Sequence, residues 1–358
     1  MFVALRDIVR AKGRFALMIG VIALLTLLLV LLTGLTRGLA HQNISAISGL
    51  PADRIVLAPT LGEDVSWSDS QIDAAQAAAI AAVPGIASEP LSVAQMRIEA
   101  GGSVTSLAVL GIEPGGEVAR GLAAVPAAGQ VVLPADTATD LGVRAGDTVT
   151  MNGQDLTVAG TAPVDWYSHS PVGYVVQDTF ADLAHQAEGA AGSALLLRGD
   201  EAALQAAAAT AADTGTRALT VRASLAGLPS YSSENGSLSL IQAFLYGISA
   251  LVTIAFLSVW TIQRTRDLAV LRALGASSRY VLADTVGQAA VLLGAGVLLG
   301  GVLGGGGGAA LAAVAPFDVS ALTVAGPVVG VLAIGLIGSL AATARVTRID
   351  PLLALGGN

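Results

Sequence analysis

Four long stretches without a charged residue dominate the hydrophobic pattern of the chain. They cover residues 15–36, 235–263, 285–317 and 319–344. A helix needs about 20 apolar residues to cross the hydrocarbon core of a bilayer. The pattern therefore predicts four membrane-spanning helices.

A secretory signal peptide is the alternative for the first stretch, because Arg6, Arg10, Lys12 and Arg14 precede it. However, the apolar region of a signal peptide has about 7–15 residues, and this stretch is longer. Thr36-Arg37-Gly38 also does not match the small-x-small pattern of a cleavage site. We therefore expect a retained helix.

The segment between the first two spans has the mixed pattern of an α/β domain. Strand-like runs occupy 54–57 and 130–133, and a hairpin is expected at 147–160 around the turn Asn152-Gly153. Alanine-rich helices are expected at 70–83 and 200–212. Ser68 or Asp69 is available to cap the first of them.

The predicted fold is an α-helical membrane protein with four transmembrane helices and a mixed α/β extracytoplasmic domain inserted between helices 1 and 2. The expected parts are a cytoplasmic amphipathic segment (1–14), the first span (15–36), an extracellular α/β domain (37–236), the second span (237–263), a cytoplasmic coupling helix (264–283), the third span (284–314), a short extracellular loop (315–320), the fourth span (321–344) and a cytoplasmic tail (345–358).

The composition agrees with membrane insertion. Of 358 residues, 54% are hydrophobic and 12% are charged, and the mean hydropathy is +0.72. Soluble domains carry about 25% charged residues. These values exclude a disordered chain, a soluble nucleic-acid binder and most cytosolic enzymes.

The charges are divided unevenly along the chain. Residues 37–237 contain 21 acidic and 8 basic residues, whereas the short flanking segments carry ten cations and few acids. Positively charged loops stay in the cytoplasm. We therefore expect both termini and the loop after the second span to be cytoplasmic, and the acidic domain to lie outside.

Residue types that are rare or absent limit the reactions and metal sites that the chain could support. Lys12 is the one lysine and lies in Ala11-Lys12-Gly13, outside any Walker A pattern, so the chain cannot be a P-loop ATPase by itself. The absence of cysteine excludes disulfides and thiol nucleophiles. His41, His169 and His185 form no zinc motif. Residues 165–170 contain the residue types of a catalytic triad, but His169 fits better as a hydrogen-bonding loop residue than as part of an enzyme.

An amphipathic segment follows the second span. Leu268, Leu271 and Leu274 recur every three residues between arginines, and Gly275 is placed to end a helix. It is either an interfacial helix or a docking element whose arginines meet acidic groups of a cytoplasmic motor.

Glycines recur at a spacing of four in the third span. They are Gly296, Gly300, Gly304 and Gly308. This spacing favours close packing against a neighbouring helix. A hinge is the alternative.

Two cytoplasmic segments carry a family resemblance. Residues 264–277 read RTRDLAVLRALGAS, and residues 345–355 read RVTRIDPLLAL. Both resemble the FtsX/MacB-type permeases of ABC transporters, and residues 129–160 fit the extracytoplasmic domain of that family. Leu353 departs from the family pattern, in which Glu is usual.

The resemblance implies a homodimer bound to two cytoplasmic ATPase subunits, which bind the ATP. Coupling residues would be Arg264, Arg266, Asp267, Leu271, Arg272 and Leu274. The chain itself would not be an enzyme and would hold no permanent cofactor or metal. It would pass ATP-driven motion to the outer domain.

A narrower resemblance points to the heme-exporting permeases of Gram-positive bacteria. It rests on Gly34 to Ser45, on residues 166–170, on residues 230–234 and on the Gly356-Gly357 ending. It implies that the pump exports heme from the membrane and so relieves heme toxicity. Alternatives are a mechanotransmitter acting on an extracellular partner such as a peptidoglycan hydrolase, or a lipoprotein or peptide exporter.

Heme is a flat dianion that needs an apolar slot, an axial ligand and cations for its propionates. The candidate heme-binding residues are Tyr231, Glu234, Arg37, His41 and Asn43. Tyr231 and Glu234 would share a helix face if the second span begins early. Tyr231 is otherwise an aromatic anchor at the membrane interface, and Arg37 the snorkelling end of a helix.

Overall fold

The computed structural model describes residues 12–59, 64–263, 270 and 274–346, and the chain divides into two compact units. One unit consists of the described residues up to Gly38 and from Gly236 onward, and the other is Leu39–Asn235. The sequence pattern placed the outer domain at 37–236.

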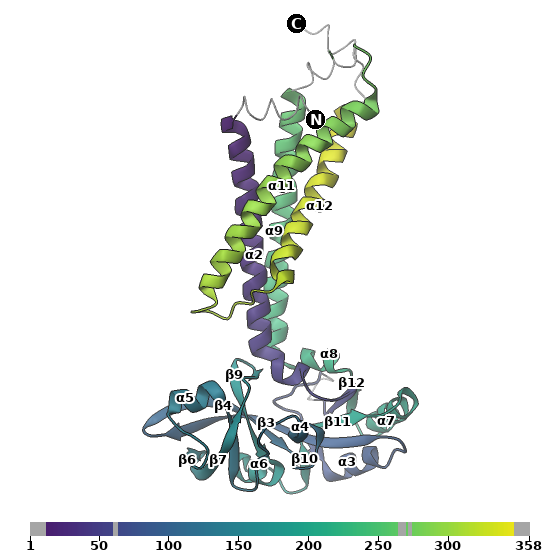
Figure 1. The fold of residues 1–358 in the computed structure, drawn as a ribbon. Coiled ribbons are helices and arrows are strands. Elements are labelled where there is room, and N and C mark those ends of the chain that lie inside the picture. Colours follow the sequence, from purple (N-terminus) through teal and green to yellow (C-terminus); the bar gives the residue numbers. More distant parts are fainter. Residues whose placement is uncertain (1–11, 60–63, 264–269, 271–273, 347–358) are drawn as a thin grey trace. The chain divides into compact units, whose positions relative to one another are not determined.

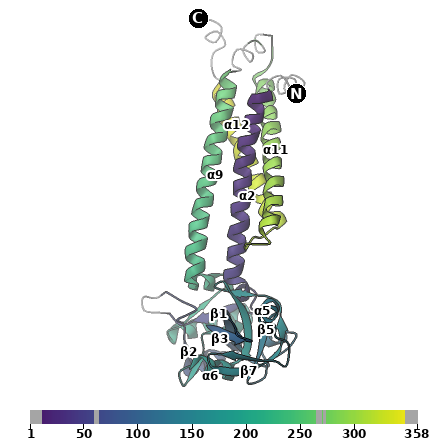
Figure 2. The ribbon, with the colours of Figure 1, turned by 90° about the vertical axis from the view of Figure 1, so that its left-hand side faces the viewer.

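The first unit is built from four helices that run side by side (Figures 1 and 2). They are α2 (Lys12–Ser48), α9 (Pro229–Gln263), α11 (Ser278–Leu311) and α12 (Ala321–Val346). Each is long and apolar enough to cross a membrane. The prediction of four transmembrane helices is confirmed.

Helix boundaries differ from the sequence pattern at three places. α2 continues to Ser48 and ends just before Gly49 and Pro51, since the residue before a proline disfavours the helical conformation. α9 begins at Pro229, so residues 229–236 are helical. α11 begins at Ser278, where the Ser277 hydroxyl accepts a hydrogen bond from the Tyr280 N–H at 3.2 Å. Residues 278–283, which the sequence pattern assigned to the coupling helix, thus belong to α11.

Glycines of α11 let it pack closely on α2. A Cβ atom at Gly296 would overlap the Ile22 side chain, one at Gly300 would overlap the Ala23 carbonyl, and one at Gly304 would overlap Val30. The fourth glycine of the series, Gly308, faces the Phe317 ring of the α11–α12 loop instead.

The Phe317 ring is held by glycines of two helices. It occupies the space that a side chain at Gly34 of α2 or at Gly308 of α11 would need, while the preceding Pro316 carbonyl contacts Gly38. The Asp318 N–H donates to the Gly34 carbonyl at 3.0 Å. This explains the Gly34 and Gly38 spacing seen in the sequence.

The second unit is a mixed α/β domain, as expected. Its main sheet has the strand order β12-β1-β11-β3-β4-β9-β5-β7-β6, with β8 paired to β9. The strands of this sheet are β1 (Arg54–Leu57), β3 (Ala87–Ala100), β4 (Ser103–Ile112), β5 (Gln130–Pro134), β6 (Thr148–Met151), β7 (Gln154–Ala162), β8 (Trp166–Tyr167), β9 (Ser170–Val176), β11 (Ala194–Arg198) and β12 (Arg217–Leu219).

Short helices and a second small sheet complete the unit. A two-stranded sheet pairs β2 (Ile72–Asp73) with β10 (Ala190–Gly192). The helical elements are α3 (Ala74–Ala81), α4 (Glu117–Arg120), α5 (Ala135–Leu141), α6 (Gln177–Ala184), α7 (Glu201–Asp213), α8 (Val221–Ser224) and the 3₁₀ turn Leu225–Gly227.

The long strand β3 joins two parts of the main sheet. It pairs with β11 and β4, and Ile98 and Glu99 near its end also pair with β6. The β3–β6 pairing closes six strands into a ring, which leaves them no free edge. One hydrophobic cluster contains Ile98, Leu107 and Val131 from this ring.

Two local predictions in this unit had different outcomes. The Asn152-Gly153 turn is confirmed, with φ values of 45° and 81° that suit a type I′ hairpin between β6 and β7. The predicted capping residue of the first alanine-rich helix, Ser68 or Asp69, was wrong. Asp73 caps α3, and Gln76 returns the hydrogen bond, which makes Asp73-x-x-Gln76 a capping box.

Candidate functional site

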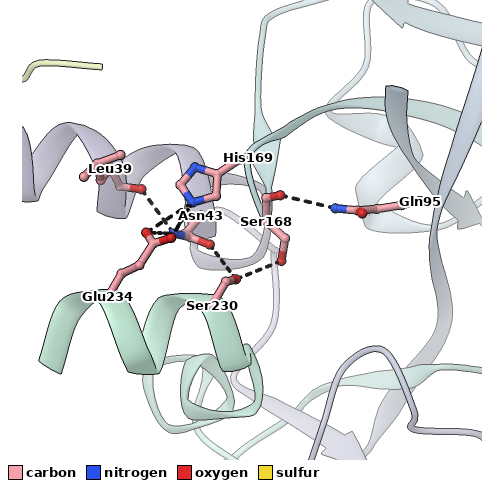
Figure 3. A network of polar contacts seen from close by, with 7 residues as sticks. All are labelled: Leu39, Asn43, Gln95, Ser168, His169, Ser230 and Glu234. Atoms are coloured by element: carbon pink, nitrogen blue, oxygen red, sulfur yellow. Dashed lines mark hydrogen bonds and ion pairs between the residues drawn. The ribbon is translucent and has the colours of Figure 1, made fainter. Parts of the chain in front are cut away.

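Three segments that are distant in sequence meet in one polar cluster of the second unit (Figure 3). They are the last turns of α2, the turn between β8 and β9, and the first two turns of α9. The side chains are Asn43 from α2, Ser168 and His169 from the turn, and Ser230 and Glu234 from α9. We call this set the Asn43 cluster.

Asn43 is the centre of the cluster and is 1% exposed. Its Nδ2 donates to Glu234 Oε2 at 3.0 Å, and its Oδ1 accepts from Ser230 Oγ at 2.9 Å. The first bond is charge-assisted, because the acceptor is a carboxylate. Asn43 thus ties α2 to two successive turns of α9.

His169 and Glu234 form an ion-pair geometry at the partly exposed side of the cluster. His169 Nε2 lies 3.1 Å from both carboxylate oxygens and 3.0 Å from Asn43 Nδ2. When His169 Nε2 carries a hydrogen it donates to Glu234, and its 3.0 Å contact with Asn43 Nδ2 is then a contact between two donors that share the same carboxylate.

An unusual turn brings His169 to this position. Ser168 and His169 have φ values of 46° and 64°, a region that residues other than glycine occupy rarely. Backbone bonds from α2 hold the turn: the Ser168 N–H donates to the Asn43 carbonyl at 3.0 Å, and the His169 N–H to the Gln42 carbonyl at 2.9 Å. Gln95 donates to the Ser168 carbonyl from the other side.

The five candidate heme-binding residues lie in different surroundings. Asn43 and Glu234 are brought together. Tyr231 shares the first turns of α9 with Glu234, but it packs against a hydrophobic cluster that contains Leu225 and Leu228. His41 and Arg37 are exposed on α2.

The sequence did not single out Ser230 or assign His169 a ligand role. Both lie within the two motifs of the narrower resemblance, residues 166–170 and 230–234, and this shared membership was the available signal. His169 does act as a hydrogen-bonding loop residue, as expected.

The residues of the triad-like run do not form a relay. Asp165 hydrogen-bonds Tyr174, His169 pairs with Glu234, and Ser168 Oγ lies 3.5 Å from Ser230 Oγ. The cluster offers one imidazole nitrogen and one carboxylate, a pair that can hold a proton or ligate an electron-poor metal centre.

Two buried tyrosines lie on β8 and β9, the strands that flank the Ser168–His169 turn. Burial raises the pKa of the Tyr167 phenol, and the negative charge of Asp69 raises it further. Burial also raises the pKa of Tyr174, with added contributions from the charge of Asp165 and its hydrogen bond. Both phenols stay neutral well above the pH at which tyrosine ordinarily ionises.

Comparison with protein families identifies the family to which the chain belongs. The MacB-like periplasmic core domain matches residues 15–215, which is more than half of the chain, and the FtsX-like permease C-terminal domain matches residues 239–351. The chain belongs to the FtsX/MacB-type permeases of ABC transporters. It is a membrane protein with an extracellular domain, and its family implies a cytoplasmic ATPase as partner.

Individual relatives cover the permease from end to end. A Staphylococcus haemolyticus protein with the provisional name hemin transport system permease protein HrtB is 24% identical over 361 residues, which span 100% of this chain and 99% of that protein. An uncharacterised ABC transporter permease of Mycobacterium tuberculosis is 28% identical over 371 residues, with the same coverage. The periplasmic region of MacB from Actinobacillus actinomycetemcomitans matches 50% of this chain and 94% of its own, with 13% identity and a TM-score of 0.39.

Most of the expected coupling residues of the permease lie outside the described residues. These are Arg264, Arg266, Asp267, Leu271 and Arg272. Leu274 is described and is 80% exposed, and its N–H donates to the Val270 carbonyl at 3.0 Å. Gly275 follows with φ 96°, a conformation suited to the residue after a helix.

Proposed function

We propose that this permease is the membrane subunit of a dimeric efflux pump that a separate ATPase drives and that exports heme from the membrane. The observation that carries the proposal is the end-to-end similarity to proteins named for hemin transport. The two segments that carry the heme-exporter resemblance also supply His169, Ser230 and Glu234 to one cluster.

The proposed orientation places both termini in the cytoplasm. The support is the charge distribution, since arginines and Lys12 gather outside residues 37–237 while acidic residues gather within them. The match of residues 15–215 to a periplasmic core domain agrees with an outer position for the acidic part.

Glu234 and His169 are the proposed ligands of the ferric iron of heme. A carboxylate oxygen and an imidazole nitrogen both ligate iron in proteins. We assign Tyr231 a lesser role, because its side chain packs against the hydrophobic cluster. Arg37 stays a predicted partner of a propionate, and exposed His41 a predicted alternative ligand.

Absorption spectroscopy tests the substrate. Hemin added to the purified permease should give a shifted Soret band, which Glu234→Ala and His169→Ala each weaken and which Tyr231→Phe leaves nearly unchanged. Hemin should also raise the ATPase activity of the reconstituted complex. If hemin neither binds nor stimulates ATP hydrolysis, heme is not the substrate, and profiling of lipoproteins and peptides becomes the next step.

Charge reversal tests the proposed coupling segment. Arg266→Glu combined with Arg272→Glu should detach the ATPase, because the arginines would no longer attract acidic groups of the partner, while the permease still inserts in the membrane. Copurification of the variant with its ATPase in normal yield would contradict the docking role.

A mechanotransmitter is the second candidate function. The second unit has its own hydrophobic clusters, and its Asn43 cluster links α2 to α9, the two helices that also supply the first unit. A pull-down with the full permease that returns a peptidoglycan hydrolase, together with normal heme tolerance after deletion, would favour this function over export.

A further inference from the structure

The two sides of α9 have different character within the first unit. Its exposed side carries large apolar residues such as Leu240, Phe244 and Leu251, which is 70% exposed. Gln242, Ser249 and Thr253 follow one another at spacings of seven and four, so they share a helix face. Ser249 is 1% exposed and Thr253 is 2% exposed. Ser249 and Thr253 are therefore turned inward, on a side of α9 that also carries buried apolar residues such as Leu257.

Ser249 Oγ and Thr253 Oγ1 have no hydrogen-bond partner in the part of the chain that the structure describes. This is costly, because a buried hydroxyl without a partner loses the hydrogen bonds that water would give it, and hydrocarbon offers none in return. In soluble and membrane proteins alike, such groups signal a missing water, an ion or a functional role.

Other buried hydroxyls of the same unit are satisfied. Thr26 Oγ1 donates to the Ile22 carbonyl at 2.8 Å, and Thr33 Oγ1 to the Leu29 carbonyl at 2.7 Å. Thr33 also accepts a bond from Gln242 Nε2 at 2.6 Å. In the described part of the first unit, the buried side chains without a partner are Ser249 and Thr253, and Ser92 Oγ and Gln177 Nε2 of the second unit also lack one.

The surroundings of the two hydroxyls are apolar on both sides along α9. Leu245 and Tyr246 pack into one hydrophobic cluster with Ile22 and Val297. On the other side, Leu257 and Trp260 pack into a second cluster. The pair lies between these clusters in sequence, so it interrupts an otherwise apolar helix interface.

We propose that Ser249 and Thr253 bind water inside the membrane-spanning unit, and that this inner face of α9 becomes hydrated during the transport cycle. Water supplies both donor and acceptor to two hydroxyls one turn apart, which apolar lipid chains cannot do. The proposal requires a membrane-inserted permease but not heme as substrate.

The absence of cysteine allows a direct test. Ser249→Cys and Thr253→Cys each create a single thiol, which reacts with a charged methanethiosulfonate only where water allows the thiolate to form. The matched controls are Ala289→Cys, buried in the apolar cluster with Trp260, and lipid-facing Leu251→Cys. Membrane vesicles with the full permease and its ATPase are labelled with and without ATP.

We expect both thiols to react about tenfold faster than the two controls during ATP turnover. Rates equal to those of Ala289→Cys and Leu251→Cys, in both conditions, would overturn the proposal. Exposed Ser232→Cys in the second unit serves as the positive control for the reagent.

A second variant guards against misfolded cysteine mutants. Ser249→Ala combined with Thr253→Val removes both hydroxyls with little change of shape. If the site is hydrated, the melting temperature should stay the same or fall. A rise would show that the hydroxyls are dry and unpaired, and it would contradict the proposal even if labelling succeeded.

Discussion

The two units of this permease achieve specific packing by different means. In the first unit, α11 packs closely against α2 because Gly296, Gly300 and Gly304 have no side chain that would overlap α2. In the second unit, α2 and α9 are joined through a buried amide, Asn43, and its hydrogen bonds. The comparison shows that steric fit specifies the α2–α11 contact of the first unit, whereas hydrogen bonds specify the α2–α9 contact of the second unit.

The largest effect should come from filling a glycine of the first unit. Gly300→Leu places a side chain where the Ala23 carbonyl and Thr26 lie, which forces α11 away from α2. We expect a loss of about 3 kcal/mol, seen as a lower melting temperature in detergent.

A glycine with free space provides the control. A Cβ atom at Gly306 would meet nothing within 4 Å, so Gly306→Ala should stabilise α11 by up to about 1 kcal/mol through helix propensity. Equal losses in the two variants would show that close packing at Gly300 does not matter.

A smaller loss should follow from removing the amide of the second unit. Asn43→Ala removes the buried amide that bonds Glu234 and Ser230, and it should cost about 2 kcal/mol although His169 remains beside Glu234. Hydrogen exchange of the Ser168 and His169 backbone amides should accelerate. Gln42→Ala is the control at the neighbouring position. Equal exchange rates of these two amides in Asn43→Ala and Gln42→Ala would contradict the central role of the Asn43 side chain.

High pH should weaken the second unit through its tyrosines. The pKa values of Tyr167 and Tyr174 are raised in the folded state, so their stabilising contribution is complete below pH 10 and is lost as pH rises through the folded-state pKa values. Each should lower the unfolding free energy by about 1.4 kcal/mol per pH unit above pH 10. Tyr167→Phe should halve this slope in pH-dependent unfolding, and an unchanged slope would exclude Tyr167 as its source.

The smallest effect concerns a helix cap. Asp73→Ala removes the side-chain acceptor at the start of α3 and should cost about 1 kcal/mol. Ser68→Ala, which changes a residue expected from the sequence to be a cap, should cost less. Hydrogen exchange of the first turn of α3 distinguishes the two, and a larger effect at Ser68 would reverse the assignment.

Hydrophobic periodicity was sufficient for the first unit because a bilayer imposes length and composition directly. The uncharged runs mark α2, α9, α11 and α12. Their ends were harder to predict. Helix α2 passes Arg37 because a charged residue ends a membrane span without ending a helix, and the backbone breaks only near Gly49 and Pro51.

The Asn43 cluster could not be predicted from sequence patterns, because its residues are distant along the chain. Asn43, His169 and Glu234 are separated by more than sixty residues, and no periodicity relates them. They come together because of the β8–β9 turn, in which Ser168 and His169 adopt left-handed conformations. No glycine at these positions indicates such a turn in the sequence. In contrast, Asn152-Gly153 is a recognised sequence signal for a hairpin turn, and the predicted turn between β6 and β7 is confirmed.

The Phe317 ring has a consequence for motion in the first unit. A single aromatic ring fills the gap left by Gly34 and Gly308, and the next residue hydrogen-bonds the α2 backbone. The ring therefore links the interior of α2, at Gly34, to the end of α11, at Gly308, and neither helix can slide along the other at this point unless the ring moves.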